Sequence, residues 1–82
     1  MNKFERINYL FFTNIGKDFD SVALHSLFGS AFRSRVSDVN RRSWYIVIKN
    51  RKTAEGKSVY WSEWRDAEAR YRASQLEAYR AN

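Results

Sequence analysis

The chain has 82 residues, a formal net charge of +6, and no cysteine or proline. A chain of this length forms one domain and buries only about 60 to 65% of its unfolded surface, so large side chains must supply a compact core. The lack of cysteine excludes disulfides and thiolate metal sites. Glu5, Arg6 and Asn8 interrupt the apolar residues near the N-terminus, so we expect no signal peptide or membrane contact and predict a cytoplasmic protein.

Residues 2–14 are expected to form an amphipathic first helix. Asn2 and Glu5 have the spacing of a capping box, in which each side chain bonds the other residue's backbone amide. Tyr9 and Phe12 lie off the apolar stripe, and we expect them to be partly buried against the C-terminal helix, with a partner contact as the alternative. The stripe itself consists of Phe4, Ile7, Phe11 and, past the helix end, Ile15.

A brief extended segment at residues 17–19 precedes a second, short helix. Asp20 is placed as its N-cap and Gly29 ends it, after which Ser30 can cap the next helix. His25 is the only histidine, and since no second ligand type accompanies it we interpret it as a surface residue. The apolar residues at helical spacing are Ala23, Leu24, Leu27 and Phe28.

The third helix, residues 31–42, has two faces of different chemistry. Phe32, Val36 and Val39 cluster on one side at about 100° per residue. The opposite side carries guanidinium and hydroxyl groups, which suit DNA because a guanidinium fork matches a guanine edge or a phosphate. We expect Asp38 to pair with an arginine three or four residues away. The outer face comprises Arg33, Ser34, Ser37 and Arg41, and Arg35 and Arg42 flank it as phosphate contacts.

From Trp44 the apolar period changes to two, which predicts a β-hairpin over residues 44–61. The polar segment 50–56 forms its turn. A basic hairpin directly after such a helix is typical of a wing, which contacts the DNA backbone or the minor groove. The cations expected at its tip are Arg51, Lys52 and Lys57.

The positive charge is concentrated in this central part of the chain. Between Ser30 and Lys57 eight Lys and Arg residues stand against two carboxylates, a surplus equal to the whole net charge of +6. A surplus packed into one segment is the electrostatic footprint of a polyanion-binding protein. The alternative is an ordinary solvated basic face.

The C-terminal segment is expected to form one further helix, capped by Ser62 and anchored inward by Trp64 and Tyr71. Its charges balance, which favours a packing role. The alternative is a homodimer contact through Leu76 and Tyr79, which do not lie on the same side of the helix as Trp64 and Tyr71.

The chain resembles small winged helix-turn-helix proteins of phages and prophages over the segment LFGSAFRSRVSDVNRRSWYIVIKNRKTAEGKSVYW. The resemblance rests on an LFG end to the second helix, the run RVSDV at 35–39, and a GK turn before the last strand. It covers about residues 4–61 and departs from the family pattern at Ser43, where a glycine usually ends the recognition helix. It implies a winged-helix fold and DNA binding.

We therefore predict an α+β protein, with a winged helix-turn-helix domain of three helices and a hairpin wing over residues 1–61. An extra C-terminal helix over 62–82 should pack on the domain or on a second subunit. The side chains expected in the core are Phe11, Leu24, Leu27, Val36, Val39, Trp44, Ile46 and Trp61.

The predicted function is sequence-specific binding of double-stranded DNA by a small phage or bacterial transcriptional regulator. The helix at 31–42 would enter the major groove, with the wing at 50–57 on the backbone or minor groove. The alternative is a protein-interaction module, for example a phage protein that binds and inhibits a host factor. We expect no enzyme, no cofactor and no metal site, because the sequence offers no nucleophile, base and orienting group together.

Overall fold

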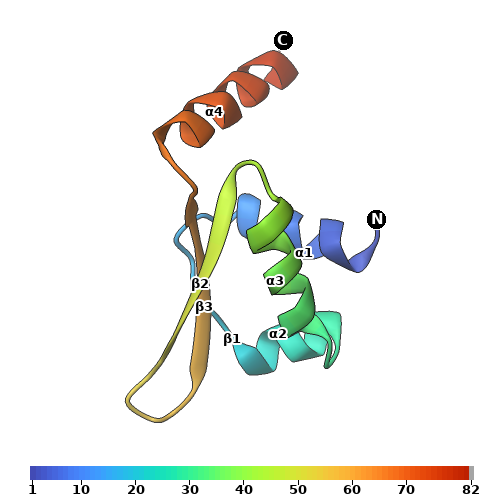
Figure 1. The fold of residues 1–82 in the computed structure, drawn as a ribbon, viewed down its shortest axis with the longest axis vertical. Helices are drawn as coiled ribbons and strands as arrows, with labels where there is room; N and C mark the ends of the chain where they lie inside the picture. Colours follow the sequence, from blue (N-terminus) through green and yellow to red (C-terminus); the bar gives the residue numbers. More distant parts are fainter. Residues whose placement is uncertain (82) are drawn as a thin grey trace.

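The computed structural model describes residues 1–81, with side chains described as far as residue 76. Over these residues the chain is an α+β fold of four helices and one three-stranded antiparallel sheet (Figure 1). No helix in this part of the chain is long and apolar enough to cross a membrane. The elements in order are α1 (Lys3–Phe12), β1 (Phe19–Asp20), α2 (Ser21–Phe28), α3 (Phe32–Arg42), β2 (Ile46–Lys52), β3 (Ser58–Trp64) and α4 (Ala67–Ala81).

The sheet has the strand order β1-β3-β2, so the strand between the first and second helices pairs with the far arm of the hairpin. β2 and β3 pair along their full length, from Ile46 opposite Trp64 to Lys52 opposite Ser58. The hairpin turn extends to the opposite end of the molecule from α4 (Figure 1). A backbone bond of 2.8 Å from the Thr53 amide to the carbonyl of residue 57 closes the turn.

The N-caps predicted in the first half of the chain are confirmed, with one exception. The Asn2 carboxamide oxygen accepts the Glu5 amide at 2.8 Å and Asp20 accepts an amide of the first turn of α2 at 2.7 Å. The predicted cap at Ser30 is wrong, because no side chain caps α3. Instead the first α3 amide bonds the Gly29 carbonyl at 3.2 Å, which closes a turn between the two helices.

The core lies between the three helices α1, α2 and α3 and one face of the sheet. Aromatic rings meet edge to face there, with Phe11 and Phe19 centroids 5.2 Å apart and Phe32 and Tyr60 centroids 5.7 Å apart. Five of the side chains predicted for the core are confirmed as buried: Phe11, Leu24, Val36, Val39 and Ile46.

Three predicted core positions are wrong. Trp44 is 76% exposed and Leu27 51% exposed, while Trp61 is half-buried. Trp44 precedes the strand, which begins only at Ile46, so the strand alternation does not fix its side. Trp61 has the wrong phase, since Tyr60 is the β3 residue that enters the core and neighbouring strand residues face opposite ways.

The start of the C-terminal helix also differs from the prediction. Ser62 and Trp64 belong to β3, because β3 remains paired with β2 to its end. Ser62 is fully buried and its hydroxyl donates to the Phe11 carbonyl at 2.8 Å, so it joins the sheet to α1 and caps no helix. The first-turn amide of α4 is bonded by Asp66 at 2.7 Å instead.

α4 lies against β3, and its buried side chains are small. Ala69 and Ala73 are buried, whereas Tyr71, predicted as an anchor, is 64% exposed. The other predicted anchor, Trp64, is half-buried in β3 and meets Phe12 edge to face at 5.8 Å. The partial burial predicted for Phe12 is confirmed, but its ring partners are Trp64 of β3 and Tyr45, whose centroid is 5.6 Å away, and not residues of α4.

The two residues suggested for a dimer contact lie on α4. Leu76 is 42% exposed. Tyr79 lies outside the residues whose side chains the structure describes.

Candidate nucleic-acid interface

The two faces of α3 have the burial that the sequence predicted. Phe32, Val36 and Val39 are 2%, 7% and 0% exposed, and they fix the helix against α1 and the sheet. The opposite face is open to solvent, and its exposed side chains are Arg33, Ser34, Ser37 and Arg41. This exposed face therefore consists of guanidinium and hydroxyl groups on a helix held from behind.

Asp38, the one carboxylate of α3, is paired on both oxygens. Arg35 reaches one oxygen with its Nη2 atom at 3.2 Å, and Arg41 bonds the other. The pairing with a neighbouring arginine is confirmed. Because Asp38 is neutralised within the helix, it adds little repulsion toward an approaching anion.

Arg35 is held more tightly to the protein than the sequence suggested. Its Nε atom is buried and has no hydrogen-bond partner among the described residues, and its side chain is 39% exposed. Arg41 remains 72% exposed despite its ion pair, so it can still turn outward. Of these two arginines, Arg41 is the better placed to meet a ligand.

Arg33 lies where the N-terminal ends of α2 and α3 meet. Its guanidinium carbon is 5.0 Å from the centroid of the Phe32 ring. A shallow hollow of about 250 Å³ next to it is also lined by Ser21 and His25. His25 is exposed, as predicted, and the hollow thus brings a cation, a hydroxyl and an imidazole together.

Two predicted contact residues turn toward other partners. Arg42 stacks over the Phe4 ring of α1, with 4.4 Å between its guanidinium carbon and the ring centroid. Arg51 pairs with Asp18 at 2.8 Å and lies 4.9 Å over the Trp61 ring. Arg42, predicted to flank the outer face of α3, is therefore held against α1, and Arg51, predicted for the hairpin tip, is paired with a residue just before β1.

The turn end of the hairpin keeps two exposed cations. Lys52 and Lys57 are exposed and form no ion pair among the described side chains. Lys49, farther from the turn, pairs with Glu63 on the facing strand at 3.1 Å. The Trp61 indole donates to Glu63 at 2.8 Å, and this bond and the one from Lys49 lower the pKa of Glu63.

A group of polar side chains that the sequence analysis missed fixes the other end of the hairpin to α3. The Asn40 carboxamide donates to the Ile48 carbonyl at 2.9 Å and accepts the Ile48 amide at 2.6 Å. The Ser43 hydroxyl accepts the amides of Tyr45 and Ile46, each at 3.3 Å. These bonds join the last turn of α3 to the first residues of β2.

Arg65, just after β3, completes this group. Its guanidinium donates to the carbonyls of Asn40 at 2.6 Å, Ser43 at 3.1 Å and Ile46 at 3.3 Å. A cation is favourable there, because the C-terminal end of a helix has unpaired carbonyls and a partial negative charge. We call Asn40, Ser43 and Arg65 the α3–β2 latch.

Ser43 also explains the departure from the pattern in which glycine ends the third helix. Its φ is −71° and its ψ is 135°, an extended conformation that any residue adopts. Glycine is therefore not needed at this position, and the serine hydroxyl supplies two bonds that glycine lacks.

Comparisons with protein-family models, with curated proteins and with solved structures each gave no match. Among the described residues, no three His, Cys, Asp or Glu side chains come together in a way that could hold a metal ion.

Proposed function

We propose that the protein is a winged helix-turn-helix protein that binds duplex DNA with sequence preference. The observation that carries this proposal is the outer face of α3, where arginines and hydroxyls are exposed while the carboxylate of Asp38 is paired within the helix. Arginine forks recognise guanine edges and phosphates, and small hydroxyls allow a helix to approach the floor of the major groove.

The order of the elements supports the winged-helix assignment. Three residues join α2 to α3, and Gly29 among them has a φ of 83°, as expected for the tight turn of a helix-turn-helix unit. A hairpin follows α3 directly, and the short strand β1 completes its sheet. α3 would be the recognition helix and the turn of the β2–β3 hairpin the wing.

The position of the wing cations fits this assignment. α3 begins toward the end of the molecule where the hairpin turn lies, away from α4 (Figure 1). The turn that carries Lys52 and Lys57 is therefore toward the same end of the molecule as the start of α3. Lysines at such a place bind phosphates as point charges and fix the register of the protein on the duplex.

The role that we propose on DNA is transcription regulation, and the small size of the protein favours a second copy at the site. A single unit of this kind contacts few base pairs, and regulatory affinity usually needs two units on a symmetric or tandem site. α4 is outside the proposed DNA-binding surface and exposes Leu76, so it is our proposed homodimer contact. Sedimentation at micromolar and higher concentration tests this, and a monomer throughout would leave α4 as a packing element.

The direct test is binding to random duplex DNA at low salt, followed by selection from a randomised duplex pool. We expect dissociation constants of about 10⁻⁴ to 10⁻⁶ M for random DNA at physiological salt, and at least about 10³-fold tighter binding to a selected site. No binding at low salt would overturn the proposal and leave the basic surface for an acidic protein partner.

A charge placed on the outer face of α3 separates this surface from general effects of charge. Ser37→Glu should weaken binding to all duplexes, because a carboxylate there repels phosphate. Ser74→Glu adds the same charge at an exposed position of α4 and should change DNA affinity far less. Both serines are exposed, so thermal unfolding of the two variants should stay close to that of the original protein.

A further inference from the structure

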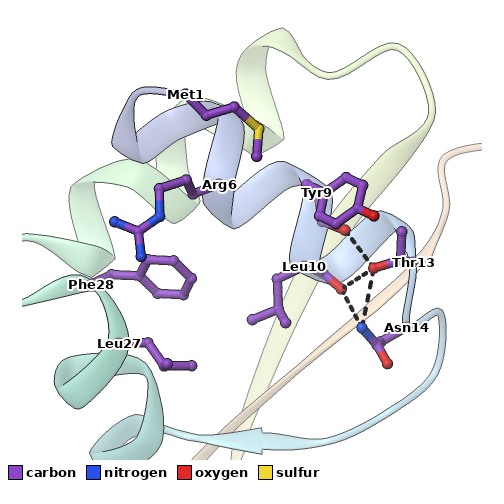
Figure 2. Close-up of a pocket in the computed structure, with 8 residues that line it drawn as sticks. All are labelled: Met1, Arg6, Tyr9, Leu10, Thr13, Asn14, Leu27 and Phe28. Atoms are coloured by element: carbon purple, nitrogen blue, oxygen red, sulfur yellow. Dashed lines mark hydrogen bonds between the residues drawn. The ribbon is translucent and has the colours of Figure 1, made fainter.

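A second surface, on the side of the helical layer formed by α1 and α2, has a different chemistry. Figure 2 shows a hollow there, with Leu10 from α1 and Leu27 from α2 pointing toward the same space. Its volume is about 350 Å³, at the lower end of the range for binding sites. We call it the α1–α2 groove. It is lined by Met1, Arg6, Tyr9, Leu10, Thr13, Asn14, Leu27 and Phe28.

The apolar lining of the α1–α2 groove is open to solvent. Met1 is 80% exposed, Tyr9 57% and Leu27 51%, so three large side chains of the lining lack cover from the rest of the domain. The expected burial of Tyr9 against the C-terminal helix is therefore wrong. Clustered exposed apolar residues commonly mark a site of interaction, whereas scattered single ones do not.

The charge at the groove is positive. The Arg6 guanidinium lies over the Phe28 ring, 5.6 Å from its centroid, and forms no ion pair among the described side chains (Figure 2). The Lys3 amine is 3.9 Å from the position that a Cβ on Gly29 would take, at the adjoining end of α2. No carboxylate lines the groove. The surface therefore favours an occupant that combines apolar side chains with an acidic group.

The elements that form the groove restrict the shape of the occupant. Every lining residue belongs to α1, the residues just before and after it, or α2, so no strand edge is available for an added strand. A groove between two helices instead accepts the apolar face of a third helix, with side chains spaced three or four residues apart.

We infer that the α1–α2 groove binds an amphipathic acidic helix of a partner protein. Two apolar side chains of that helix, one turn apart, fill the space between Leu10 and Leu27, and a neighbouring Asp or Glu pairs with Arg6. This interaction is independent of DNA binding, because no lining residue belongs to α3 or to the hairpin. The protein could therefore hold DNA and a protein partner at the same time.

The test is selection from a displayed library of helical peptides against the intact protein. The expected sequences carry apolar residues one turn apart together with Asp or Glu. Leu27→Gln should weaken a selected peptide by about tenfold or more, because it removes an apolar wall of the groove. Val22→Gln is the matched control: Val22 is on the same helix, is 70% exposed and does not line the groove, so peptide affinity should not change.

A charge swap tests the acidic character. Arg6→Glu should weaken the selected peptide by about five- to tenfold, and replacing its acidic residues with lysine should restore binding to that variant but not to the original protein. Sequences without acidic residues, or no enrichment over the Leu27→Gln protein, would overturn the inference. A dimer in sedimentation that Leu27→Gln dissociates would also overturn it, since a second copy would then be the occupant.

These outcomes are separate from those for DNA. Leu27→Gln should leave DNA affinity unchanged, and Ser37→Glu should leave peptide affinity unchanged. A failure of either proposal therefore does not carry over to the other.

Discussion

The two ends of the β2–β3 hairpin are held in different ways. At the end near α3, the latch of Asn40, Ser43 and Arg65 ties the helix to the strand through side-chain bonds to backbone groups. At the turn, Lys52 and Lys57 are exposed, and the bonds that close the turn are those between residues 53 and 57.

This difference gives the two ends of the hairpin separate roles: one end orients α3 against the hairpin, and the other presents cations to a ligand. The latched end fixes the angle between the proposed recognition helix and the wing, whereas the turn presents charges that can adjust to a phosphate backbone. Precise orientation matters most for reading base edges, because each bidentate contact depends on geometry, while phosphate contacts tolerate movement. Substitutions at the two ends should therefore have different consequences.

The largest effect, on the free energy of unfolding, is expected from a substitution in the core that supports α3. Val39 is fully buried between α3 and the rest of the core, so Val39→Asp places a carboxylate where no partner exists. The loss should be about 3 to 5 kcal/mol of unfolding free energy, a large part of the stability of a small domain. Val22→Asp, at a 70% exposed position, should change it by less than about 0.5 kcal/mol.

Denaturant unfolding monitored by circular dichroism measures both Val variants. An unchanged unfolding midpoint for Val39→Asp would mean that the assigned inner face of α3 is wrong.

The latch should come next. Asn40→Ala removes both bonds to the Ile48 backbone, and the expected cost is about 1 to 3 kcal/mol of stability. The same variant should lose discrimination between a selected site and random DNA, because α3 is no longer fixed to β2. Ser74→Ala, at an exposed position of α4 outside the proposed DNA-binding surface, is the control and should affect neither property.

A narrower effect, confined to DNA affinity and leaving stability unchanged, is expected at the outer face of α3. Arg33→Ala and Arg41→Ala should each cost about 1 to 3 kcal/mol on a selected site and much less on random DNA. Fluorescence anisotropy with the two duplexes measures this difference. An equal loss on both would remove that arginine from the residues that read bases.

The smallest effect belongs to the turn. Lys52→Ala and Lys57→Ala should each weaken binding to all duplexes alike and reduce the slope of log K against log salt by about 1. Thr53→Ser, in the turn between the two strands, is the control. It keeps the hydroxyl that accepts the residue 57 amide and changes no charge, so DNA affinity and the salt slope should stay the same. A lysine variant that lost only affinity for the selected site would contradict the division between the two ends.

The sequence predicted those parts of the fold that depend on near neighbours. The cap at Asn2, the cap at Asp20, and the buried face of α3 all arise from residues within one or two helical turns, and they are confirmed. The reciprocal half of the capping box is wrong, because the Glu5 carboxylate accepts the Asn2 carboxamide and not the Asn2 backbone amide. The latch could not be predicted in this way, because Arg65 meets Asn40 across 25 positions of the chain.

Two of the errors, at Trp61 and Ser62, lie on β3 and have the same cause. Alternation fixes which residues share a face but not which face is inward, so the pattern places Trp61 in the core, where the structure has Tyr60. Ser62 has a side chain that often caps helices, yet strand pairing carries β3 past it and buries its hydroxyl against α1. Partners distant in the chain decided both positions.

For the proposed contact residues, the sequence predicted which face of α3 is exposed, but not the partner of each arginine. The exposed arginines and hydroxyls of α3 follow from helical geometry, as do their positions opposite the core. Local spacing could not indicate that Arg42 stacks on Phe4 or that Arg51 pairs with Asp18, since both partners are remote in the chain.

Backbone amide NMR signals, followed during titration with random duplex DNA at low salt, show where a duplex contacts the protein. We expect the largest shifts at Arg33, Ser34 and Ser37 on α3 and around Lys52 and Lys57 at the hairpin turn, with small shifts along the α1–α2 groove. Shifts confined to other surfaces, or none at low salt, would contradict the assignment of α3 and the hairpin as a DNA-binding surface.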